Sequence, residues 1–151
     1  MTTSTDTIDL GLAAAQTIVA GALAHARDNA MNPLAVCVLD ARGALKAFAA
    51  EDGTSLNRGD IARGKANGAL ALGMGSRSLF KRAKEQAFFI AAATTTIGGS
   101  LVPVPGGVLV RTASGRLIGV VGISGDTSDN DEACALAGIA AAGLAGDPGA
   151  D

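Results

Sequence analysis

The segment from Pro105 to Ala135 constrains the fold more than any other part of the chain. It contains a glycine-rich turn, Pro105-Gly106-Gly107, and then an apolar run, Leu117–Ile123, bracketed by glycines. A tight turn at Ser124-Gly125 leads to Ser128. Asp131 follows Ser128 by three residues, as the acid does in a capping box. The pattern predicts a buried strand followed at once by a helix with an acidic first turn, where carboxylates stabilise the helix dipole.

Two pairs of short apolar runs predict two β-hairpins. Each pair is joined by a short segment that ends in glycine, which is typical of hairpin turns. The first pair comprises residues 34–39 and 44–49, and the second comprises residues 108–112 and 117–123. The two hairpins together supply four antiparallel strands.

Helical spacing of apolar residues marks the segments around the hairpins. Apolar residues recur there at steps of three and four, which indicates helices that bury one face. The predicted helices cover residues 8–26, 56–72, 76–90 (with a break near residues 84–86) and 128–144. This order predicts an α/β (α+β) fold, with a single antiparallel sheet of two hairpins and helices packed against it, as a profilin-like layered domain.

A length of 151 residues is typical of one domain. We expect residues 1–7 to be a disordered N-terminal segment, residues 8–145 to form the domain and residues 146–151 to be a flexible tail. The first residues lack the basic start and apolar run of a signal peptide. No segment is apolar enough over the length needed to span a bilayer. A cytoplasmic protein with no membrane partner is therefore expected.

Charge and residue types exclude other classes of partner. The net charge is −2, and four Phe residues are the only aromatic ones, so neither phosphate attraction nor base stacking favours nucleic acid. A single histidine, His25, excludes a two-histidine zinc site. The acidic run from Asp126 lacks the glycine and glutamate of a calcium loop, and we expect no metal site. Cys37 and Cys134 are expected to be buried free thiols.

Motifs spread along nearly the whole chain resemble those of the GlcG/HbpS-like family, which includes haem-binding secreted proteins and the haem-binding C-terminal domain of PduO-type proteins. The resemblance departs at Ala50, where many members have an Arg two residues before the Asp. The matching motifs are Val36–Gly43, Asp52-Gly53, Lys65-Ala66, Pro105-Gly106-Gly107-Val108, Gly115–Gly125 and Asp131-Glu132-Ala133-Cys134-Ala135.

The resemblance implies a small-ligand-binding protein with a pocket between sheet and helices. The ligand would be haem or a related tetrapyrrole, in a role of haem handling, degradation or sensing. Haem would need an axial ligand from His25, Met31, Met74, a cysteine, or a weak Ser or Thr oxygen.

Backbone chemistry suggests where a ligand would be held. Glycine permits close approach, so the Pro105-Gly106-Gly107 turn would bring bare N–H groups near a bound molecule. Arg58, Arg63 or Arg111 would replace the missing Arg before Asp52. We therefore name Pro105, Gly106, Gly107 and Arg111 as cofactor-binding candidates.

A small-molecule enzyme is the alternative interpretation. Lys65, with Asp52 or Asp131, would transfer protons or hold an anion, and the Gly106-Gly107 amides would cradle an oxyanion. The substrate would be a small acid or carbonyl compound. These three side chains are the catalytic candidates.

Composition also predicts a homo-oligomer. The core is rich in alanine, and burying so small a side chain stabilises the fold only slightly. Contacts between subunits would bury further apolar surface and add to the stability. The first and last predicted helices each present a stripe of mostly alanine. Such stripes suit helix contacts across a symmetric interface, and the resemblance implies even-numbered assemblies with the pocket near the subunit boundary.

Overall fold

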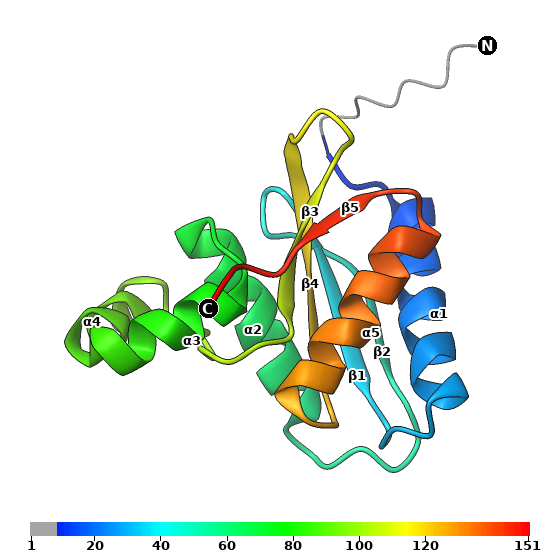
Figure 1. Ribbon diagram of the computed structural model, residues 1–151, viewed down its shortest axis with the longest axis horizontal. Coiled ribbons are helices and arrows are strands. Elements are labelled where there is room, and N and C mark those ends of the chain that lie inside the picture. The colour runs from blue at the N-terminus through cyan, green and yellow to red at the C-terminus, as the bar shows by residue number, and fades with distance from the viewer. Residues whose placement is uncertain (1–8) are drawn as a thin grey trace.

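The computed structural model of the chain describes residues 9–151 (Figure 1). The N-terminal segment of residues 1–7, for which disorder is expected, lies outside the described residues. The helices are α1 (Leu12–Asp28), α2 (Arg58–Leu72), α3 (Ser76–Glu85), α4 (Ala87–Thr96) and α5 (Ser128–Ala141). The strands are β1 (Ala35–Asp40), β2 (Leu45–Ala50), β3 (Gly107–Arg111), β4 (Leu117–Ser124) and β5 (Ala145–Asp147).

The strands form one antiparallel sheet in the order β2-β1-β4-β3-β5. The hairpins β1–β2 and β3–β4 are both present, and they join through β1 and β4, where Cys37 lies opposite Gly122. Two hairpins in one layered sheet with helices against it confirm the predicted fold class. Strand β2 forms one edge of the sheet.

Several sequence-based boundaries differ from the structure by a few residues, among them the end of α4 and the cap of α5. Helix α4 continues to Thr96, inside the segment expected to be a loop from residue 94. The N-cap of α5 is Thr127, whose hydroxyl accepts from the Asn130 amide, and not Ser128. Both differences move an element end by a few residues and leave the order of elements unchanged.

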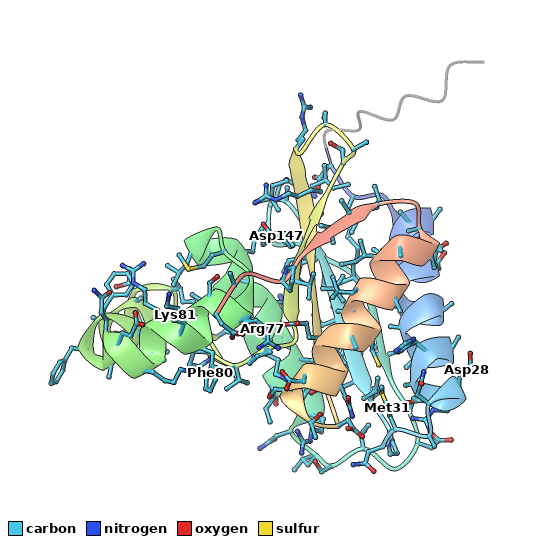
Figure 2. All side chains as sticks on the ribbon, viewed as in Figure 1. Asp28, Met31, Arg77, Phe80, Lys81 and Asp147 are labelled. Atoms are coloured by element: carbon cyan, nitrogen blue, oxygen red, sulfur yellow. The ribbon has the colours of Figure 1, made fainter. Side chains whose placement is uncertain are left out.

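Residues 146–151, which we expected to form a flexible tail, are instead held by contacts with the rest of the fold. Ala145–Asp147 form β5, which pairs with β3. Beyond β5, the Arg77 guanidinium lies 3.1 Å from the Asp151 carboxylate, and the Ala150 amide donates to Ser78 Oγ. These contacts with α3, near the labelled Arg77 in Figure 2, hold the C-terminus against the fold.

The two faces of the sheet carry different helices. Alternate residues of β1 point to opposite faces: Val36 and Val38 pack in a cluster with α1 and α5, and Cys37 and Leu39 pack in a second cluster with α2. Figure 1 shows α1 and α5 side by side on one face, with α3 and α4 set off to the side. No helix among residues 9–151 is long and apolar enough to cross a membrane.

The alanine stripes of α1 and α5 are used within the chain. A Cβ added at Gly21 would lie 2.9 Å from the Ala141 Cβ, and one at Gly138 would overlap the Ile18 carbonyl oxygen. The two helices therefore pack at backbone distance against each other. The stripe residues Ala15, Ala22 and Ala26 of α1 are buried within the chain, so they are not available to the subunit interface that we expected there.

Helix α2 lies equally close to the sheet. A Cβ at Gly122 of β4 would overlap the Ala62 carbonyl oxygen and would lie 2.9 Å from the Ala66 Cβ. Glycine is required there because backbone atoms, which cannot rotate away, occupy the space. The close approach also fixes where the next turn of α2 places its side chains.

We predict that Gly122→Ala lowers the free energy of unfolding by about 2 kcal/mol or more, because overpacking against backbone forces a shift of α2. Urea unfolding measures the change. Gly11→Ser is the control, since nothing lies within 4 Å of its added Cβ and serine is favoured at a helix N-cap. An unchanged urea midpoint for Gly122→Ala would contradict this packing.

Candidate functional site

Lys65 and Asp131 meet in a buried ion pair. Lys65 is on α2 and Asp131 is in the first turn of α5, and their side chains are 2% and 1% exposed. Lys65 Nζ donates to Asp131 Oδ2 at 3.0 Å and to the Ile123 carbonyl at 2.9 Å. Asp131 Oδ1 accepts from the Asp126 amide at 2.9 Å. One ammonium thus ties α2, the end of β4 and the start of α5.

The Pro105-Gly106-Gly107 turn covers this pair. Gly106 has a φ of 126°, and a Cβ there would lie 2.9 Å from Lys65 Nζ. The Gly106 carbonyl accepts from the Ile123 amide at 3.0 Å, and the Gly107 amide donates to Ser76 Oγ at 2.7 Å. The Gly107 N–H is therefore already used inside the protein. Sequence analysis missed Ser76, for which the chain carries no local signal.

Burial sets the protonation chemistry of the pair. Loss of solvent raises the pKa of Asp131, although the Lys65 ammonium acts in the opposite direction. Loss of solvent likewise lowers the pKa of Lys65, against the attraction of Asp131. Both shifts oppose charge in an apolar place. The pair has the character of a structural tie, since a substrate needs solvent access that neither side chain has.

The remaining candidates lie elsewhere. Asp52 is exposed in the turn after β2, in a hollow that Arg27, Pro33, Ala50 and Glu51 also line. Arg27 of α1 binds Glu51 there at 3.0 Å, a cation that sequence analysis did not connect with Ala50.

Arg111 of β3 pairs with Asp147 of β5 at 3.1 Å. The structure therefore brings together Lys65, Asp131, Gly106 and Gly107, with Pro105 buried beside them. It places Asp52 and Arg111 outside this group.

An open groove runs between α1 and the edge strand β2. Its volume is about 450 Å³, which is within the range of small-molecule sites. Leu12 is 54% exposed, whereas the Phe48 ring points to the other face of the sheet, where it lies against Gly59 of α2. We call this the α1–β2 groove, and it is lined by Leu12, Gln16, Val19, Ala20, Leu23, Lys46, Ala47 and Phe48.

One cation, Lys46, stands in this apolar lining. No ion pair or hydrogen bond of its ammonium is found among residues 9–151. An apolar surface beside an unpaired ammonium suits a ligand that has an apolar body and an acidic group. No pattern in the sequence singles out Lys46 or Phe48, because only the sheet order shows that β2 is an edge.

The soft metal-binding side chains lie outside the α1–β2 groove. His25 is half-buried two residues beyond Leu23, about 200° further around the helix, and follows by four residues Gly21, which meets α5. The Met31 sulfur accepts from the Cys134 thiol at 3.3 Å. Met74 packs in the separate cluster of Leu79.

The cysteines are buried thiols, as expected. Burial raises the pKa of Cys37 and of Cys134 to about 11, so both stay protonated at neutral pH. Among residues 9–151, no group of three or more His, Cys, Asp or Glu side chains is placed to hold a metal ion.

We predict that Lys65→Met destabilises the fold by about 3–5 kcal/mol, because it leaves the Asp131 carboxylate buried without its cation. The double variant Lys65→Met/Asp131→Asn should recover part of this loss, since no uncompensated charge remains. Urea unfolding of the three proteins measures both effects. Equal stability of Lys65→Met and wild type would show that the pair does not tie these elements.

The deficit of Lys65→Met should also shrink as the pH falls. Without the cation, the folded-state pKa of Asp131 rises further above its unfolded value, so the folded state binds the proton more tightly. Stability then increases as the pH decreases through that folded pKa. Unfolding at about pH 8 and about pH 5 tests this. The double variant lacks the carboxyl group and should not share the trend.

Comparisons with known proteins agree with this fold. The family model described as "Haem degrading protein HbpS-like" matches residues 10–140. No curated protein sequence matches the chain significantly.

Solved structures with the same fold include three at 23–26% identity. A PduOC:haem complex has a TM-score of 0.80 at 24% identity, covering 91% of this chain and 97% of that one. Klebsiella pneumoniae protein ORFY has a TM-score of 0.81 at 23% identity, covering 95% and 97%. HbpS has a TM-score of 0.75 at 26% identity, covering 89% and 91%. Because the family model matches most of its length, the chain belongs to the HbpS-like family.

Proposed function

We propose that this chain is a binding protein for a small amphiphilic ligand of the tetrapyrrole class. The ligand lies in the α1–β2 groove, its ring against the apolar side chains and a carboxylate near Lys46. The observation that carries the proposal is an apolar groove of ligand size lined by Lys46, for whose ammonium no ion pair is found among residues 9–151. The family description and the haem complex of a similar structure support the choice of ligand class.

The enzyme alternative has less support. Its base, Lys65, is bonded to Asp131 and to the Ile123 carbonyl and is 2% exposed. The Gly107 amide, half of the expected oxyanion cradle, is bonded to Ser76. A proton-transfer site needs groups that a substrate reaches, so we favour binding over catalysis.

Titration with a tetrapyrrole tests the proposal, and Ala20→Trp is the decisive variant. Ala20 is exposed and lines the groove, so an indole there fills the space that the ring would take. We expect saturable binding of haemin by wild type and a loss of affinity of about tenfold or more in Ala20→Trp, equivalent to about 1.4 kcal/mol.

Thr17→Trp is the matched control, because Thr17 is exposed on the same helix but does not line the groove. It should bind as wild type does. A linear, non-saturable absorbance change with wild type would refute the proposal. An equal loss of haemin affinity in both variants would show that the ligand does not bind in the groove.

We also propose that the chain is a homo-oligomer and that α4 is part of its interface. Helix α4 contains no charged residue, yet only Ile90 of it is buried, and Phe88 is 94% exposed. The hydroxyls of Thr94, Thr95 and Thr96 donate to carbonyls four residues back, so this end of the helix presents methyl groups.

A second copy of the chain suits this helix. The large residues of α4 are near its start and the small ones, Ala and Thr, near its end. Two copies packed antiparallel would place the exposed Phe88 of each over the small residues of the other helix, since the Phe89 ring already lies against Arg82 of its own chain. Such self-complementary contact is the geometry of a two-fold interface.

We predict a mass of at least two chains for wild type by size-exclusion chromatography with light scattering. Phe88→Asp should shift the mass toward the 14.8 kDa of one chain. Leu56→Asp is the control, because Leu56 is as exposed, at 96%, but lies in the turn before α2. A wild-type monomer at high concentration, or an equal shift in both variants, would contradict an α4 interface.

A further inference from the structure

We infer that the α1–β2 groove binds a tetrapyrrole through its ring and its carboxylates and not through a metal, so that metal-free and iron forms bind alike. The inference rests on the proposed function and narrows its ligand class. It follows from the side chains that line the groove and from the places where the iron-binding residue types lie.

The lining contains no ordinary axial ligand. Haem iron in proteins is held by His, Cys, Met or Tyr. None of these is among the eight lining residues, and the chain has no Tyr. The two polar lining residues are Gln16, whose amide oxygen is a weak ligand for iron, and Lys46, whose ammonium has no lone pair with which to bind iron. The residues that line the groove therefore do not fit a ligated haem iron.

The residue types that bind iron more strongly lie elsewhere in the fold. His25 is on the α5 side of α1, away from the α1–β2 groove. Met31 accepts a hydrogen bond from the Cys134 thiol of α5, within the core cluster. Figure 2 labels Met31 near the lower end of α1. Met74 packs near α3. To reach the groove, Met31, Cys134 and Met74 would have to leave these packing sites, and His25 would have to turn to the other side of α1.

The groove does fit the organic part of such a ligand. Six of its eight lining residues are apolar, and ring contact with apolar side chains is favourable in proportion to the area removed from water. Lys46 offers a partner for a propionate carboxylate. Neither contribution depends on what occupies the centre of the ring.

A competition assay tests the inference directly. Metal-free protoporphyrin IX is titrated with the protein by its own fluorescence, and haemin is then used to displace it. We expect one shared site and dissociation constants for the two forms that agree within about threefold, because both forms make the same contacts. Bound haemin should lack the absorption bands of a low-spin iron with a protein ligand.

Variants distinguish a carboxylate contact with Lys46 from ligation of the iron by His25. Lys46→Met should weaken both forms by a similar factor of about two to five, as for the loss of one partly exposed ion pair. Lys81→Met is the control: it removes an equal charge from α3, away from the groove (Figure 2). His25→Ala should change neither the affinity for haemin nor the spectrum of bound haemin.

Two outcomes overturn the inference in distinguishable ways. Haemin that binds more than about tenfold tighter than the metal-free form, with a low-spin spectrum lost in His25→Ala, shows iron ligation. That result refutes metal independence and leaves the proposed function intact. Saturable binding of neither form refutes the proposed function and the inference together.

Discussion

The Lys65 ammonium is the point on which the arrangement of this fold depends. It joins α2, the end of β4 and the start of α5 through two hydrogen bonds, to groups 58 and 66 residues away along the chain. A buried charge is costly unless it is paired and hydrogen-bonded, and here both conditions are met. The Gly106 turn closes over it with no room for a side chain. The family's glycine motif therefore acts as a cover for an ion pair.

This arrangement separates stability from binding within one small chain. The polar groups that appeared catalytic in the sequence are used in holding the helices to the sheet. The α1–β2 groove, an apolar surface with room for a ligand, is instead at the β2 edge of the sheet, away from the end of β4 that Lys65 holds. Close packing at Gly21, Gly122 and Gly138 brings the helices to backbone distance of each other and of the sheet.

Much of the fold was predictable from local pattern. Alternation and helical spacing predicted both hairpins and the order of helices. Sequence analysis named Asp52 or Asp131 as the partner of Lys65 but could not choose between them, because no local signal links residues 66 positions apart. Asp52 was grouped with them for its charge alone. The exposure of Lys46 depends on which strand forms the edge, and strand β5 on contacts of the C-terminus with α3, and both are properties of the assembled sheet.

Amide chemical-shift mapping with metal-free protoporphyrin IX locates the ligand without assuming a site. We expect the largest shifts along α1 and β2, at Val19, Leu23, Lys46 and Phe48, and nearly unchanged amides at Gly106, Gly107 and Asp131. Shifts centred on Gly106, Gly107 and Asp131, with α1 and β2 unaffected, would contradict this expectation and would return the site to the buried pair.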